Sequence, residues 1–296
     1  MKTFQLSEKL LKKIADLIQA KKNSPLKKLV KDIHFADMAE IIDELNLDEG
    51  VYLIKLFDSE KTSEILTELD DDVREKILKR LSVKEIADEI EELDSDDAAD
   101  ILGELSDQRK EEVISEISDD SLADDLKELL SYEENSAGGL MAKELVKANE
   151  NWTVTKCLKE IKQQGENVTR VHSIYVVDDK EKLIGRLSLK DLITSPSKKL
   201  IKDIYIPKVD SVNVFEDGEE VAKIMSKYDL EAIPVINNKK QLLGRITIDD
   251  IVDLIKEEAE EDYLLAAGVQ GDVEADDSIF ELTKARLPWL FLGLIG

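Results

Sequence analysis

A twelve-residue repeat runs through the first half of this chain and constrains its fold more than any other feature. From residue 45 to residue 129, every twelfth position is apolar, and so is the position three residues before each of them. The eight pairs are Ile42 and Leu45, Ile54 and Phe57, Leu66 and Leu69, Leu78 and Leu81, Ile90 and Leu93, Leu102 and Leu105, Ile114 and Ile117, and Leu126 and Leu129. Two residues three apart share one face of a helix, so each pair predicts a helix of about two turns.

A residue that can cap a helix N-terminus follows each of the first seven pairs. A side-chain oxygen at that position accepts a hydrogen bond from an unpaired backbone N–H. These residues are Asn46, Asp58, Asp70, Ser82, Asp94, Ser106 and Ser118. The unit is therefore a short helix followed by a cap that begins the next helix. Because two turns are too short to be stable alone, the units must stack as a superhelical array.

The charge balance limits the classes of partner. The chain has 67 Asp and Glu against 41 Lys and Arg, a formal net charge of −26. A protein that binds nucleic acid needs a basic face, so nucleic acid is excluded as a partner and cations are favoured. One cysteine, two histidines and no glycine-rich phosphate loop leave little for a catalytic centre, so we predict that the chain is not an enzyme. Residues 1–31 are basic, with nine lysines and two acids, and we expect their amphipathic helix to dock on the acidic neighbour, with anionic lipid as the alternative.

Carboxylates are densest between residues 85 and 134, a stretch that holds 21 of them. Asp96 and Asp100 lie one helical turn apart, so their side chains point the same way and their charges repel. A divalent cation would relieve this repulsion. Glu64 stands 32 residues before Asp96, directly before the Ile65-Leu66 pair of its own repeat.

The second half contains a duplicated unit. The segment Ser136-Ala-Gly-Gly-Leu-Met141 interrupts the helical pattern, and residues 174–193 then match residues 233–252 at an offset of 59. Each copy predicts a buried strand, a turn, a second strand with a Gly-Arg pair, and a helix. An amphipathic helix precedes each copy, at residues 154–163 and 219–228. This pattern resembles a tandem pair of CBS (cystathionine-β-synthase) domains, which are β-α-β-β-α units that pair through their sheets.

The resemblance implies a cleft for an adenine nucleotide, with ATP as the expected ligand. The hydroxyl-x-x-Asp element of that family occurs as Ser188-Leu-Lys-Asp191 and as Thr247-Ile-Asp-Asp250. In the family the acidic residue often binds ribose and the hydroxyl contacts phosphate, while residues before the next strand line the adenine. The implied nucleotide-binding residues are Ser188, Lys190, Asp191, Pro207, Lys208 and Thr247.

The last ten residues, 287–296, carry no charge and follow Arg286. A spanning helix needs about 20 apolar residues, so we interpret this run as the beginning of a transmembrane helix. A C-terminal helix packed on the core is the alternative. We therefore predict a multidomain fold in which an all-α superhelical array of short helices precedes α/β tandem CBS domains and a connecting helix that leads to a truncated transmembrane segment.

The order of these parts is similar to the cytosolic part of MgtE-type magnesium transporters. The most specific marks are Tyr132-Glu-Glu-Asn-Ser-Ala-Gly-Gly-Leu-Met141 and Ala285-Arg-Leu-Pro-Trp289. The expected boundaries are 1–135 for the helical N domain, 136–200 and 201–258 for the CBS domains, 259–286 for the connecting plug helix region, and 287–296 for the first transmembrane helix. The resemblance implies a bacterial cell-membrane protein with this region in the cytoplasm.

The resemblance also implies a mechanism. The N domain and the CBS pair close when cytosolic Mg²⁺ is high, and the connecting helix then blocks the pore of the protein's own transmembrane domain. The implied Mg²⁺ ligands are Glu64, Asp96, Asp100, Glu219, the carbonyl of Ser226, Asp229, Asp250, Asp253, Glu258, Glu261 and Asp262. A homodimer through the CBS domains is expected. Two other functions remain open: a soluble CBS-pair regulator that senses adenine nucleotides, and a helical-repeat scaffold.

Overall fold

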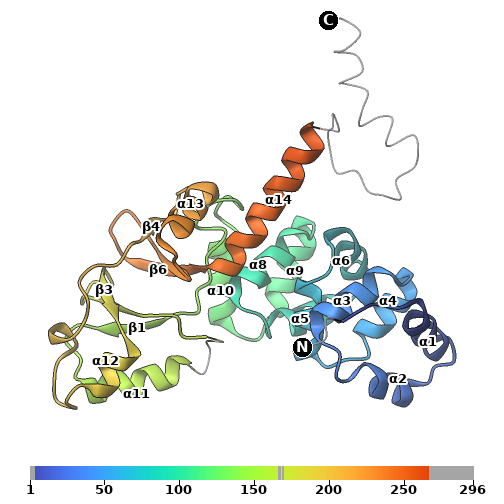
Figure 1. Ribbon diagram of the computed structural model, residues 1–296, viewed down its shortest axis with the longest axis horizontal. Coiled ribbons are helices and arrows are strands. Elements are labelled where there is room, and N and C mark those ends of the chain that lie inside the picture. Colours follow the sequence, from blue (N-terminus) through green and yellow to red (C-terminus); the bar gives the residue numbers. More distant parts are fainter. Residues whose placement is uncertain (1–3, 166–167, 169, 267–296) are drawn as a thin grey trace, which may run out of the picture.

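The computed structural model describes residues 4–165, 168 and 170–266. An array of short helices forms the first half, and an α/β body lies beside it (Figure 1). The array consists of α1 (Glu8–Gln19), α2 (Asn23–Val30), α3 (Phe35–Asp43), α4 (Leu47–Ile54), α5 (Ser59–Thr67), α6 (Asp71–Leu78), α7 (Val83–Ile90), α8 (Ser95–Gly103), α9 (Asp107–Glu116) and α10 (Asp120–Leu129).

Helices of the array pack on the helix two places along the chain. α3 contacts α5, α5 contacts α7, α7 contacts α9, and the same step joins α4 to α6 and α8 to α10. The apolar pairs of the repeat supply the shared core, in which Ile90, Leu102 and Leu126 have no exposed surface. Leu93 is only partly buried, although its repeat position is equivalent to the buried Leu69. The superhelical array predicted by the twelve-residue period is confirmed.

The predicted caps are correct at six of the seven positions. Asn46, Asp58 and Ser82 accept a bond from the backbone of the helix that follows, and Ser82 forms a reciprocal capping box with Glu85. Three further predicted caps occupy the N-cap position but make no side-chain cap bond: Asp70, Asp94 and Ser106. The prediction of Ser118 is wrong, because the neighbouring Asp119 accepts bonds from the N–H groups of residues 121 and 122.

The basic N-terminal helix docks on the array. α1 contacts α2 and α4, and it buries Ile14 and Ile18 in the core that it shares with them. Its Ser7 side chain caps the helix by accepting a bond from the N–H of Leu10. This is the docking arrangement that we preferred over lipid binding, because the apolar stripe already has a partner within the chain.

The second half contains two three-stranded sheets of the same topology. The first has β1 (Val146–Asn149), β2 (Ile174–Val177) and β3 (Leu183–Leu187), and the second has β4 (Val212–Asn213), β5 (Ala232–Ile236) and β6 (Leu242–Thr247). In each sheet the first pair of strands is parallel and the second pair is antiparallel. The accompanying helices are α11 (Val154–Gln164), α12 (Leu189–Thr194), α13 (Gly218–Tyr228), α14 (Ile248–Ala266) and a 3₁₀ turn at Ile201–Asp203. The duplication predicted from the 59-residue offset is confirmed.

The Gly-Arg pair of each repeat makes the same backbone contact. Arg186 exchanges two N–H···O bonds with Ile206, of 3.0 and 2.8 Å, and Arg245 exchanges two with Ala142, of 2.8 and 2.9 Å. A Cβ atom on Gly185 would lie 2.3 Å from the Ile206 carbonyl oxygen, and one on Gly244 would lie 2.6 Å from that of Ala142. The crossing backbone approaches so closely that only glycine fits before each arginine.

The helix α14 leaves the junction between the two halves and projects away from both (Figure 1). Among the described residues, no helix combines the length and apolar character needed to cross a membrane. The predicted transmembrane start, 287–296, and most of the plug region, 267–286, lie outside the described residues.

Candidate functional site

The beginning of α8 meets the segment that joins the array to the first sheet. The N–H and the hydroxyl of Ser95 both donate to Oε2 of Glu144, over 3.1 and 2.9 Å. The N–H of Lys143 donates to the Ser95 hydroxyl oxygen over 2.8 Å. Because Asp94 makes no cap bond, Glu144 takes over part of the capping of α8 from outside the array.

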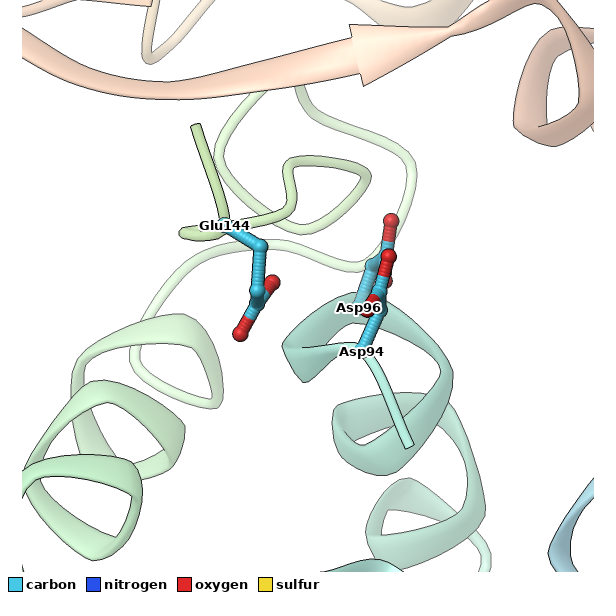
Figure 2. A group of neighbouring side chains, drawn as sticks. All are labelled: Asp94, Asp96 and Glu144. Atoms are coloured by element: carbon cyan, nitrogen blue, oxygen red, sulfur yellow. The ribbon is translucent and has the colours of Figure 1, made fainter. Parts of the chain in front are cut away.

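Three carboxylates gather at this point. One oxygen from each of Asp94, Asp96 and Glu144 lies within 4.8 Å of the other two. Figure 2 shows Asp94 directly before α8, Asp96 on its first turn and Glu144 on the facing segment. Asp96 is only 9% exposed, and its Oδ1 accepts a bond of 3.0 Å from the N–H of Asp97. The group therefore offers oxygen ligands of the kind that hard divalent cations bind.

The second CBS repeat faces the same point. Arg245 of β6 is 6% exposed, and its Nε donates to the carbonyl of Glu144 over 2.6 Å. Its Nη2 pairs with Oδ2 of Asp94 at 3.3 Å. At the start of α14, Oδ2 of Asp250 accepts bonds from the N–H and the hydroxyl of Thr247, of 2.8 and 2.7 Å. Array and CBS pair are thus in direct contact through charged groups.

The electrostatics of this interface disfavour the ionised carboxylates. Burial, and then the charge of Asp250, raise the pKa of Asp96 well above its usual value. Desolvation and the same charge raise the pKa of Asp97 to about 7, although part of its side chain remains exposed. Burial raises the pKa of Asp250 to about 6, even though its bonds from Thr247 favour the charged form. A bound cation would reverse these shifts by compensating the charges.

Two other predicted ligands surround the same cluster. The charges of Asp100 and Glu64 both raise the pKa of Asp97, which places these carboxylates within electrostatic reach of the interface. Both side chains are exposed. Of the residues predicted from sequence, Asp96 and Asp250 thus lie at the interface, and Glu64 and Asp100 lie within electrostatic reach of it.

The remaining predicted ligands lie on α13 and α14. Glu219 is paired with Lys223, and Asp253 is paired with Lys256. Ser226 and Asp229 are exposed at the end of α13, where Asp229 adopts a left-handed conformation with φ 50°. Glu258 is half-buried on α14 and has an interaction partner. The side chains of Glu261 and Asp262 lie outside the described residues.

Sequence reasoning missed three contributors to the interface. Asp94 was assigned only to helix capping, and neither Glu144 nor Arg245 was considered as part of a site. The repeated Gly-Arg pair did draw attention to Arg245. The same pair in the first repeat contains Arg186, whose side chain is exposed. The local sequence therefore held no signal that distinguished the two.

A separate cavity of about 260 Å³ lies between the two repeats. Its lining includes two of the predicted nucleotide-binding residues and consists of Leu183, Ile184, Pro207, Lys208, Val209, Ser211, Ile236 and Lys240. Ser188, Lys190 and Asp191 lie at the start of α12, outside this lining. Thr247 lies apart from the cavity as well, buried at the array interface with its hydroxyl bonded to Asp250.

Fold and sequence together define the class. Residues 33–135 match the family described as the MgtE intracellular N domain, and residues 137–198 and 201–257 each match the CBS domain. The chain therefore belongs to the MgtE family and has the organisation of its cytosolic domain. This family consists of magnesium transporters and not of enzymes, as the sequence predicted.

Individual relatives agree with this assignment. The chain is 39% identical over 170 residues to the magnesium transporter MgtE of Enterococcus faecalis, covering 56% of this chain and 37% of that protein. Identity to MgtE of Thermus thermophilus is 37% over 169 residues, covering 56% and 38%. The chain thus spans less than two fifths of these relatives.

Two solved structures share the fold over nearly their whole length. The cytosolic domain of the Mg²⁺ channel MgtE in complex with ATP has a TM-score of 0.76 and 31% identity, covering 82% of this chain and 99% of that one. The soluble part of a magnesium transporter has a TM-score of 0.72 and 29% identity, covering 85% and 99%.

Proposed function

We propose that this chain is the cytosolic Mg²⁺-sensing region of a magnesium transporter, in which Mg²⁺ holds the array against the second CBS repeat and thereby gates the pore. The observation that carries the proposal is the meeting of Asp96 from the array with Asp250 from the CBS pair, both poorly solvated and both close to further carboxylates. Ionised carboxylates that meet at one interface repel one another, and cations between them relieve this repulsion.

The spacing of the carboxylates suits a hydrated Mg²⁺ ion. Mg²⁺ binds oxygen at about 2.0–2.1 Å in an octahedron, so opposite ligands lie about 4.2 Å apart, and it keeps several of its waters. The oxygens of Asp94, Asp96 and Glu144 lie within 4.8 Å of one another, a separation that one ion with bound water spans. An ion that binds this closed arrangement better than the open one shifts the population toward closure.

Small-angle X-ray scattering tests this switch. We expect the radius of gyration to fall as Mg²⁺ rises to the millimolar range, and not to fall with KCl at matched ionic strength, since screening alone would respond to both salts. Asp96→Asn combined with Asp250→Asn should abolish the Mg²⁺ response. Proteolysis of the joining segment, residues 136–139, would be a poorer measure of closure. This segment is itself bonded to the second CBS repeat, since the Ala137 N–H donates to the Glu216 carbonyl over 2.8 Å. A double variant that compacts at the same Mg²⁺ concentration as wild type would exclude these carboxylates as the sensor.

An adenine nucleotide is a second proposed ligand. The cavity lined by Pro207, Lys208 and Lys240 combines apolar walls with two cationic side chains, which suit a base and phosphates. Ser188, Lys190 and Asp191 would bind from the start of α12, while Thr247 is already committed to Asp250. Calorimetry should show weaker ATP binding for Lys208→Ala than for wild type. Equal affinities would remove the nucleotide from this cavity.

Apolar side chains at equivalent positions of the two repeats support the proposed homodimer. Leu189 and Ile193 of α12 are 49% and 63% exposed, and their counterparts 59 residues later, Ile248 and Val252 of α14, are 39% and 43% exposed. Such repeated exposed residues are typical of a buried interface between copies. Sedimentation should show that Ile193→Glu with Val252→Glu lowers the mass from dimer to monomer. A dimer that survives both changes must use another face.

In a bacterial membrane this region would lie in the cytoplasm beneath its transmembrane domain.

A further inference from the structure

The first 31 residues carry a cluster of lysines that the proposed sensor does not use. They hold nine lysines, two acids and no arginine, so they contribute +7 to a chain of net charge −26, and the rest of the chain carries −33. The matched family model begins at residue 33, after α1 and α2. The family assignment therefore leaves the role of these two helices open. We propose that their lysines form a docking surface for anionic lipid headgroups, which holds the outer end of the array against a membrane.

The lysine surface consists of eight exposed side chains on α1, on α2 and beside them. They are Lys9, Lys12, Lys13, Lys21, Lys22, Lys27, Lys28 and Lys31. On α1, Lys9 and Lys12 lie one turn apart, on the side of the helix opposite the buried Ile14. The last turn of α2 adds Lys27 and Lys28. Packing of the two helices thus uses their apolar faces and leaves the lysines to solvent.

The lysine surface has no acidic partner within the described part of the chain. Exposed lysines elsewhere in the array do pair, as Lys55 does with Glu85 and Lys79 with Glu75. None of the eight forms an ion pair with a described carboxylate, although the chain has 67 acidic residues. These positive charges are therefore available to an external anion.

The lysine surface is presented by helices that are fixed on the array. Nζ of Lys61 on α5 donates to the carbonyl oxygens of Val30 and Ile33 at the end of α2, over 3.2 and 3.1 Å. The hydroxyl of Tyr52 on α4 donates to the side chain of Asn23, the first residue of α2. A fixed surface loses less conformational entropy on binding than a flexible basic tail would. Because the apolar faces stay packed, the lysines meet headgroups and nothing inserts among the acyl chains.

The use of lysine alone favours lipid phosphates over the carboxylates of another protein surface. Lysine offers a hydrated point charge, whereas arginine forms a planar two-bond pair with a carboxylate. Two ion pairs of this chain with largely buried side chains do use arginine, those of Arg74 with Glu104 and of Arg245 with Asp94. The choice of a membrane as the partner rests on the proposed function, which places this chain beneath a bacterial one.

The position of α1 and α2 reduces the repulsion between an acidic protein and an anionic membrane. Both helices lie at the end of the array away from the CBS pair (Figure 1). Charges more than about 8 Å apart are largely screened at physiological ionic strength. The headgroups therefore interact mainly with the lysines next to them, and each lysine close to an anionic membrane strengthens binding by about fivefold.

Sedimentation of the full chain with lipid vesicles tests this docking surface. The vesicles contain equal parts of phosphatidylglycerol and phosphatidylcholine, and the buffer contains EDTA so that divalent cations do not bridge carboxylates and phosphates. We expect binding that is lost at high KCl concentration. Vesicles of phosphatidylcholine alone are the reference, because any binding through the uncharged run at residues 287–296 does not depend on the charge of the lipid.

Two variants of equal net charge make the test specific. The test variant changes four lysines of the surface: Lys12→Gln, Lys13→Gln, Lys27→Gln and Lys28→Gln. The control variant changes four exposed lysines of the CBS half: Lys159→Gln, Lys162→Gln, Lys198→Gln and Lys199→Gln. The test variant should bind the anionic vesicles at least about tenfold more weakly than wild type, while the control should bind as wild type does. Both should keep the thermal midpoint of wild type, because all eight side chains are exposed.

Three results would overturn the inference. They are equal binding by the two variants, equal binding to vesicles with and without phosphatidylglycerol, and self-association of wild type without vesicles that the test variant abolishes. The last result would assign the lysine surface to a second copy of the chain. Because the vesicle assay contains no Mg²⁺, failure of wild type to become compact with Mg²⁺ would refute the proposed sensor and leave the lipid result unaffected.

Discussion

Glu89 of α7 should make the array less stable as the pH rises. Its Oε2 is buried without a hydrogen-bond partner. Burial, followed by the charges of Asp88, Glu92, Glu85 and Asp58, raises the pKa of Glu89 from 4.5 to about 8. The folded protein therefore keeps a proton on this carboxyl over a pH range in which the unfolded chain has already lost it. Stability falls with pH wherever the folded state binds more protons, so this group destabilises the array progressively between its unfolded and folded pKa values.

The size of the effect follows from the shift. At about 1.4 kcal/mol per pH unit, moving a pKa from 4.5 to about 8 would cost about 5 kcal/mol in full. Glu89 is only half-buried, and solvent screening reduces this to about 1–2 kcal/mol. Glu89→Gln removes the ionisation and keeps the shape, so the variant should exceed wild type in stability by this amount at alkaline pH and by much less at acidic pH.

Urea unfolding followed by far-ultraviolet circular dichroism measures the difference in stability between the variant and wild type. Measurements at pH values of about 5.5 and about 8.5 enclose most of the range between the unfolded and folded pKa values of Glu89. Glu111→Gln on α9 is the control, because it makes the same change in net charge at an exposed position. Equal stabilisation by both variants would assign the gain to reduced overall repulsion. No gain from Glu89→Gln at the higher pH would refute the reasoning.

Three further outcomes test the packing. Cys157 has no exposed surface and burial raises its pKa to about 11, so a thiol reagent should label it only after denaturation; labelling of the native protein at neutral pH would contradict the fold of α11. Ile90→Ala in the array core should cost about 2–5 kcal/mol in urea unfolding, and a change below about 1 kcal/mol would argue against the shared core. Gly185→Ala should lower the thermal midpoint because its Cβ would meet the Ile206 carbonyl at 2.3 Å, whereas Gly103→Ala on α8, with open space around it, should maintain or raise the midpoint.

The array could be predicted because its information is local. A helix of two turns, its apolar face and its cap all lie within twelve residues, so Ile42 through Leu129 reveal the period directly. Errors arose where neighbours compete: Ser118 and Asp119 both suit an N-cap, and only the geometry of the turn selects Asp119. The CBS repeats were equally visible through their 59-residue offset.

The interface could be predicted only in part. Asp96 and Asp250 came from the family resemblance, whereas the bonds of Ser95 to Glu144 and of Arg245 to Asp94 join residues 49 and 151 positions apart. No periodicity encodes such pairs. Identical Gly-Arg sequences gave one exposed and one buried arginine, because the array covers only one of the two equivalent sides of the CBS pair.

The attachment of the array at one end has a mechanical consequence. The described contacts with the CBS pair involve α8 and its surroundings, while α1 and α2 lie at the far end of the array (Figure 1). α8 packs on α10, α10 packs on α9, and α9, α7, α5 and α3 pack on one another in that order. A tilt at α8 is therefore transmitted along the stack, and the displacement grows with distance from the pivot. The array can thus rotate about its attachment to the CBS pair, with the carboxylates and Arg245 at the pivot. A molecule that bound at α1 or α2 would exert the greatest torque on the interface for a given force.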